Sequence, residues 1–194
     1  MLFRYFGQQA AWERKGFRFK MPIKLLDSTL VSLTISVYDW AHYTTSKGAV
    51  KMHTLLDYDC LLPEFMNITG GKRTDNKAAF DIEIKPHSIV VADRGYCDYG
   101  LLNHWDSNNV FYVVRHKDDI QHRTIKELPL PEKHAQNVLL DEIIEFELPT
   151  AKDKCPKRLR RIAVWDEEHG FVIELLSNNV TLAASTIAKL YKAR

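Results

Sequence analysis

The stretch at residues 89–105 reads IVVADRGYCDYGLLNHW. Its apolar residues lead directly into Asp93, and Arg94, Gly95 and Tyr96 follow before a segment with the composition of a helix, expected at residues 99–105. A short, continuous apolar run is typical of a strand that is buried on both faces of a sheet. A carboxylate at the end of such a strand has two interpretations. Either it caps the next segment, or the sheet presents a charge at its edge for chemistry.

The chain on both sides of this stretch alternates between strands and helices. Apolar or alternating runs predict strands at residues 23–26, 30–37, 49–56, 61–68, 88–92, 110–114, 138–148, 159–165 and 171–176. Helices are expected at residues 75–84, 99–105 and 182–194, with Thr74 and Thr181 as N-caps. Four prolines and several strand-like runs at residues 120–170 indicate a β-rich insertion. This order predicts a mixed α/β architecture in which helices cover a sheet.

Charge is informative through its distribution along the chain. The net charge of +2 does not by itself indicate a nucleic-acid-binding protein. Residues 1–26 nevertheless carry six Lys or Arg against one Glu, and residues 152–161 carry six against one Asp. Two basic patches fit a polyanionic partner, but each also fits a solvated face, and the sequence leaves both interpretations open.

Cysteine usage and hydropathy indicate where the protein works. The three cysteines (Cys60, Cys97 and Cys155) are widely spaced and form neither a CxxC pair nor a disulfide framework. This is typical of a reducing cytoplasm. No apolar run approaches the roughly 18 residues of a transmembrane helix, so we expect no membrane partner.

Two aspartates, Asp27 and Asp93, follow apolar strands in this interpretation. Carboxylates at the ends of neighbouring strands are suited to hard divalent cations, and such ions support phosphodiester chemistry. The alternative is structural: Asp27 would form a turn before Ser28, and Asp93 would cap the helix at residues 99–105.

Four motifs taken together resemble a known family. They are LLDST (residues 25–29), SKGAVKMHTLLDY (46–58), VVADRGY (90–96) and TIAKLYKAR (186–194). In this order they resemble the DDE transposases of bacterial insertion sequences, in the group with a Tyr-x2-Arg-x3-Glu-x6-Lys signature. The resemblance extends from about Lys24 to Arg194.

The resemblance implies an RNase H-like (retroviral-integrase-like) mixed sheet flanked by helices, with a β-rich insertion. It divides the chain into a basic N-terminal stub at residues 1–22, a core at 23–118, the insertion at 119–178 and the start of the final core helix at 179–194.

The resemblance also implies roles for individual residues. Asp27 and Asp93 match the first two catalytic acids and would be metal ligands, with two Mg²⁺ (or Mn²⁺) ions in the intact parent protein. Tyr191 and Arg194 match the first two letters of the signature and would lie near DNA phosphates. A weaker match places Lys47, Lys51 and His53 near DNA, and the alternative for these three is a solvent-facing strand.

Two further candidates come from the residues themselves. Arg115 follows the strand at residues 110–114 and is suited to a phosphate, although a surface role fits as well. Trp165 follows a basic run, where an aromatic ring can stack on a flipped base. The alternative for Trp165 is packing within a hairpin.

The resulting expectation is the catalytic core of a cut-and-paste DNA transposase. The family's third acid, a glutamate, would fall four residues beyond Arg194, so we expect these 194 residues to be an inactive fragment. The expected partners are transposon-end and target DNA, with a homodimer on DNA in a bacterial cytoplasm. The alternatives are another RNase H-like nuclease and a non-catalytic DNA-binding remnant.

Overall fold

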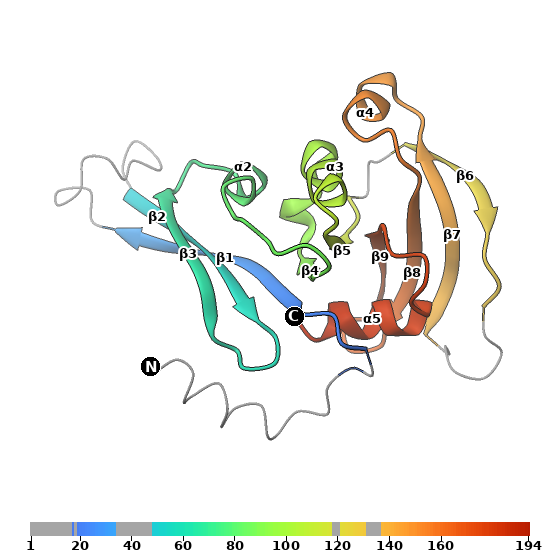
Figure 1. Ribbon diagram of the computed structural model, residues 1–194, viewed down its shortest axis with the longest axis horizontal. Helices are drawn as coiled ribbons and strands as arrows, with labels where there is room; N and C mark the ends of the chain where they lie inside the picture. The colour runs from blue at the N-terminus through green and yellow to red at the C-terminus, as the bar shows by residue number, and fades with distance from the viewer. Residues whose placement is uncertain (1–16, 18, 34–47, 118–120, 131–136) are drawn as a thin grey trace. The chain divides into compact units, whose positions relative to one another are not determined.

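A computed structural model describes residues 17, 19–33, 48–117, 121–130 and 137–194 (Figure 1). The chain divides into two compact units, Met1–Ser88 and Ile89–Arg194. No helix among the described residues has the length and apolar character needed to cross a membrane.

The first unit contains an antiparallel sheet with the strand order β3-β2-β1. Its elements are β1 (Ile23–Leu33), β2 (Gly48–Asp57), β3 (Pro63–Gly70) and the short helix α2 (Asp75–Ala79). Buried apolar side chains from strand and helix form its core, among them Leu26, Leu55, Ala78 and Ala79. This core holds α2 against β2.

Two predictions for the first unit were wrong in their boundaries. The strands expected at 23–26 and 30–37 are one strand, because β1 pairs with β2 without interruption from Lys24 to Leu33. Residues 34–37 lie outside the described part. The helix expected at 75–84 ends at Ala79. Beyond it, Ile82 and Ile84 are buried while their neighbours are exposed, and this period of two is incompatible with a continuing helix.

The second unit contains a mixed sheet with the strand order β4-β5-β9-β8-β7-β6. Strands β4 and β5 are parallel and the other pairs are antiparallel. The strands are β4 (Ile89–Ala92), β5 (Phe111–Arg115), β6 (His122–Glu127), β7 (Val138–Phe146), β8 (Leu159–Asp166) and β9 (Phe171–Ser177). The helices are the 3₁₀ turn η2 (Arg94–Tyr96), α3 (Tyr99–Ser107), α4 (Pro149–Lys154) and α5 (Ala184–Lys192).

Helices cover both faces of this sheet (Figure 1). On one face, the ring of Trp105 in α3 lies 6.1 Å from that of Tyr112 in β5, and Tyr99 lies 4.4 Å from Phe146 in β7. Helix α5 packs on β4, β5, β7 and β8. Because strand residues alternate between faces, Arg115 in β5 lies on the opposite side from Tyr112, and it lines a cavity with α5.

The strand-rich segment predicted after β5 is present as the antiparallel strands β6 to β9. The sequence did not predict β6 or α4. Strand β6 reads HRTIKE, and its hydrogen-bond pairing with β7, rather than an apolar pattern, holds it in the sheet.

Candidate active site and DNA-facing cavity

Asp93 lies at the point where the buried strand β4 ends. Its Oδ1 accepts the Gly95 N–H at 2.9 Å, so the carboxylate caps η2. Helix α3 is capped by Asp98, whose Oδ1 accepts the Leu101 N–H, so the alternative in which Asp93 caps this helix was wrong. The Asp93 side chain is 42% exposed, and its Oδ2 lies 3.9 Å from Nη2 of Arg194. The carboxylate thus combines a capping role with access from solvent.

The last turn of α5 brings the two signature residues to this point. The guanidinium of Arg194 lies 5.6 Å from the centroid of the Tyr191 ring, which is a cation–π distance. The same guanidinium faces Asp93. Asp93 and Arg194, which are 101 positions apart in the sequence, are therefore neighbours in the second unit.

A cavity of about 410 Å³ lies beside Arg194. Four residues that the sequence singled out for DNA contact line it: Arg115, Trp165, Tyr191 and Arg194. The apolar part of the lining is Val164, Phe171, Ile173, Leu175 and Ala188, and the acidic turn between β8 and β9 supplies Asp166, Glu167 and Glu168. The cavity therefore combines cations, aromatic rings and an apolar wall with the carboxylates of one turn.

Phe171 and Lys192 also line this cavity and were not predicted. The guanidinium of Arg115 lies 5.3 Å from the centroid of the Phe171 ring, so the ring supports the cation. The sequence signal for Phe171 was its place at the start of β9, opposite Asp166 in the β8–β9 hairpin. Trp165, in the same hairpin, is 41% exposed.

The hairpin turn at the cavity has its own electrostatics. The His169 ring lies 2.8 Å from Oδ2 of Asp166, and the Glu168 N–H donates to Oδ1. These hydrogen bonds, that of His169 first, lower the pKa of Asp166. The carboxylate consequently stays ionised and gives this part of the cavity a negative charge.

The candidates in the first unit have different surroundings. Asp27 lies within β1, opposite Thr54, and is exposed, so its predicted place at a strand end was wrong. His53 is fully buried, its Nε2 lies 3.0 Å from Thr69 Oγ1, and burial lowers its pKa. Lys51 pairs with Asp75 at 3.1 Å. Lys51 thus joins β2 to α2 and His53 joins β2 to β3, so both side chains have partners within the first unit, and their contact with DNA stays a prediction. Lys47 lies outside the described residues.

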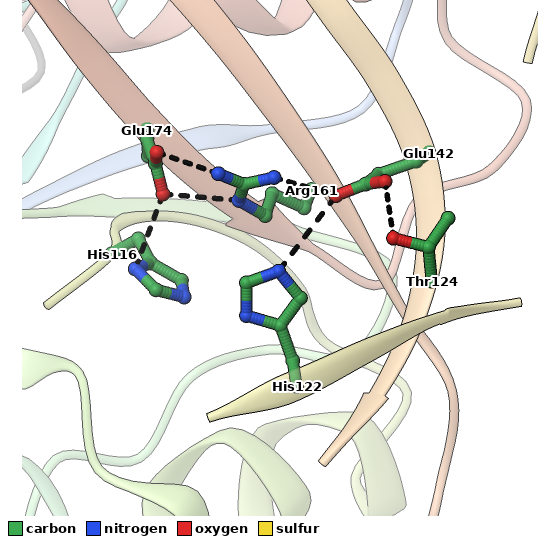
Figure 2. Close-up of polar contacts among 6 residues, drawn as sticks. All are labelled: His116, His122, Thr124, Glu142, Arg161 and Glu174. Carbon is green, nitrogen blue, oxygen red and sulfur yellow. Dashed lines mark hydrogen bonds and ion pairs between the residues drawn. The ribbon is translucent and has the colours of Figure 1, made fainter. Parts of the chain in front are cut away.

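In the basic run at residues 152–161, two arginines are neutralised by carboxylates within the fold, and the use of its exposed part as a polyanion patch stays a prediction. Arg160 makes a bidentate ion pair with Asp141. Arg161 lies between Glu142 and Glu174, with Thr124, His116 and His122 around the two carboxylates (Figure 2). Lys157 pairs with Asp106, and Lys152 and Arg158 lie within 4 Å of Glu145. We call Arg161 and its five neighbours in Figure 2 the Arg161 cluster.

The donor chemistry of Asp93 suits a hard divalent cation, because Oδ2 of this half-exposed carboxylate is an oxygen ligand at the edge of a sheet. The exposed carboxylate of Asp27 is of the same kind. Within the described residues, no three His, Cys, Asp or Glu side chains are grouped closely enough to hold a metal ion.

Comparison with known proteins gives this geometry a family context. The chain is 26% identical over 181 residues to the probable transposase for insertion sequence element IS5377 of Geobacillus stearothermophilus, covering 93% of this chain and 47% of the relative. It is 28% identical over 173 residues to the putative transposase y4zB of Sinorhizobium fredii (strain NBRC 101917 / NGR234), covering 89% and 48%. The chain thus spans about half the length of the curated relatives it matches.

The fold also matches a solved structure. The chain resembles the piggyBac transposase in its synaptic complex with hairpin DNA, with a TM-score of 0.50 and 10% identity, covering 88% of this chain and 37% of that one. The RNase H-like mixed sheet predicted from the sequence is thereby confirmed. The family described as "Transposase DDE domain" matches residues 18–194. The chain therefore belongs to the DDE transposase family, a family of enzymes.

Proposed function

We propose that this chain is the catalytic core of a cut-and-paste DNA transposase. The observation that carries the proposal is the pairing of Asp93, at the end of β4, with Arg194, at the end of α5. A carboxylate suited to a metal ion and an arginine suited to a phosphate are thus adjacent. The membership of the DDE transposase family supports the same reaction class.

The proposed reaction has two steps. Water attacks the phosphorus of a phosphodiester at the transposon end, and the P–O bond to the 3′ oxygen breaks to leave a 3′-hydroxyl. That hydroxyl then attacks a second phosphodiester, and the oxygen displaced there leaves in its turn. Two Mg²⁺ or Mn²⁺ ions, held by Asp27, Asp93 and a glutamate following Arg194, would supply activation of the attacking oxygen and stabilisation of the leaving one.

The chain's own residues bind and orient the DNA in this proposal. Arg194 donates to a phosphate next to Asp93, and the Tyr191 ring supports its guanidinium. Arg115, held over Phe171, binds a second phosphate. Trp165, on the same cavity, stacks on an unpaired base.

We further propose the arrangement predicted from the sequence: a core at 23–118, an insertion at 119–178 and the start of the last core helix at 179–194. The full protein would act as a homodimer on transposon ends and target DNA in the cytoplasm. Because the third acid is expected beyond Arg194, the 194 residues by themselves would bind DNA without cutting it.

A strand-cleavage assay tests this proposal. The 194-residue chain is compared, on a labelled duplex with Mg²⁺ or Mn²⁺, with a chimera that continues into the segment following the matched region of the Geobacillus relative. Cleavage by the chimera alone, reduced at least about 100-fold by Asp93→Asn, is the expected result. The matched control is Asp98→Asn, which changes the α3 cap and leaves Asp93 intact. Cleavage that survives Asp93→Asn would refute the assignment of Asp93.

A further inference from the structure

The connection between β9 and α5 decides where α5 begins. Strand β9 ends at Ser177, and α5 starts at Ala184. The N-cap residue, Ala183, makes no side-chain capping hydrogen bond. Helix α5, which contains Tyr191 and is followed by Arg194, is thus not fixed at its start by a side-chain cap of its own.

Arg160, in β8, supplies this fixation from the sheet. Its guanidinium is almost fully buried, with 5% of the side chain exposed. Nε and Nη2 donate to the two carboxylate oxygens of Asp141 at 2.7 and 2.6 Å. Nη1 donates to the backbone carbonyls of Asn179 at 3.2 Å and of Leu182 at 2.6 Å. One planar group therefore joins β7, β8 and the residues directly before α5.

Two asparagines complete the connection. Oδ1 of Asn179 accepts the backbone N–H groups of Thr181 and Leu182. Asn178 accepts the Tyr112 N–H and donates to the Val110 carbonyl, which ties the connection to β5. The loop is thus held in one conformation, and Arg160 is its contact with β8.

A small tilt of α5 would separate the groups at its other end. A nine-residue helix is roughly 13 Å long, so a tilt of about 10° at its start moves its end by roughly 2 Å. The distance from Arg194 Nη2 to Asp93 Oδ2 is 3.9 Å. A displacement of roughly 2 Å is about half of this distance, so it would separate Arg194 from Asp93.

We propose that Arg160, oriented by Asp141, is a positioning residue that sets α5 so that Arg194 meets the DNA phosphate beside Asp93. The inference rests on the proposed function for the role of Arg194. Lysine cannot replace this arginine, because four donations in one plane require the guanidinium fork.

The neighbouring Arg161 is a matched control. It also lies in β8 and is also paired with carboxylates, those of Glu142 and Glu174. Because successive strand residues point to opposite faces, Arg161 faces away from the Arg160 side. Its hydrogen-bond partners among the described residues, Glu142 and Glu174, both lie in strands. Arg161→Lys therefore disturbs a similar ion pair without touching the connection to α5.

A double-mutant cycle on DNA affinity tests the proposal with the 194-residue chain. Arg194→Ala should weaken binding about tenfold and lower the salt slope by about one. Arg160→Lys should weaken DNA binding by a similar factor. The double variant should bind DNA less than about twofold more weakly than Arg194→Ala alone. For the control pair, Arg161→Lys and Arg194→Ala, the fold-losses of DNA affinity should multiply, because the two sites are independent. Multiplying effects of Arg160→Lys and Arg194→Ala would overturn the proposal.

Hydrogen exchange provides a readout that does not need DNA. Arg160→Lys should raise exchange in α5 and at residues 178–183, whereas Arg161→Lys should raise it in the strands. Unchanged exchange in α5 would overturn the positioning role whatever the DNA result. If Arg194→Ala leaves DNA affinity unchanged while α5 exchange responds to Arg160→Lys, the phosphate role of Arg194 fails and the control of α5 by Arg160 stands.

Discussion

The cavity beside Arg194 and the Arg161 cluster use arginine in different ways. In the cavity, Arg115 and Arg194 lie over aromatic rings and near the surface. In the cluster, Arg161 is shared between Glu142 and Glu174. Burial acts to lower the pKa of Arg161, and the two carboxylates raise it by more, so the group stays charged but neutralised by its partners. Arg161 is thus neutralised by two carboxylates at hydrogen-bond distance, whereas Arg194 faces the single carboxylate of Asp93 at 3.9 Å and Arg115 lies over the Phe171 ring.

The largest effect should come from breaking the cluster with Arg161→Ala. Glu142 is buried and would lose its cationic partner, so unfolding should become easier by about 3–5 kcal/mol. Urea denaturation followed by circular dichroism measures this change. A loss below about 1 kcal/mol would mean that the cluster contributes little to stability.

In the cavity, Arg115→Ala should instead change binding. Without the cation held over Phe171, affinity for a duplex end should fall about tenfold, with stability nearly unchanged. The control is Arg123→Ala in β6, an exposed arginine paired with Glu145, which should leave affinity within about twofold. Equal losses from both variants would show that the binding depends on overall charge.

Lower pH should weaken the Arg161 cluster, because the contribution of Glu174 to stability depends on its ionisation. Burial acts to raise the pKa of Glu174, but the hydrogen bonds from Arg161 lower it by more, to below its ordinary value of 4.5. A depressed carboxyl pKa stabilises the fold above the unfolded-state pKa, and this contribution is lost as the pH falls through the folded-state pKa. Glu174→Gln should therefore cost about 1 kcal/mol at pH 7, a modest loss because the side chain is 33% exposed.

The stability difference between wild type and Glu174→Gln should then shrink as the pH falls below about 4.5. Thermal unfolding measured across this range tests the expectation. A difference that stayed constant down to pH 3 would exclude ionisation of Glu174 as its source.

The smallest effect should come from Arg158→Ala, at the exposed part of the basic run. Its side chain is 64% exposed and lies 3.9 Å from Glu145. Unfolding free energy should stay within about 0.5 kcal/mol of wild type. DNA affinity should fall less with Arg158→Ala than with Arg115→Ala. An equal fall would show that the exposed part of the basic run contacts DNA.

Much of the secondary structure follows from local patterns. The strands expected at residues 49–56, 110–114 and 159–165 appear as β2, β5 and β8 with shifts of one residue, because their apolar or alternating character is local. Strand β6 has no such pattern, since its pairing with β7 decides its conformation. The continuous β1 likewise depends on a partner, β2, that the local sequence around Asp27 does not reveal.

For the candidate site too, the sequence identified individual residues, and the tertiary structure decided which of them lie together. The sequence by itself determined the family resemblance, the apolar strand that ends at Asp93, and the identities of Arg115, Trp165, Tyr191 and Arg194 as candidates. Only the tertiary structure decided that these four line one cavity.

The structure also decided which cations are already paired. In the sequence, Arg160 and Arg161 belong to a basic run, and their partners Asp141 and Glu142 lie 19 residues earlier. Asp141 and Glu142 belong to a segment, residues 118–147, in which acidic residues outnumber basic ones, and this composition does not show which cation each carboxylate meets. The physical reason is that strand and helix patterns act over a few neighbouring residues, whereas ion pairing and cavity lining depend on which distant segments the folded sheet brings into contact.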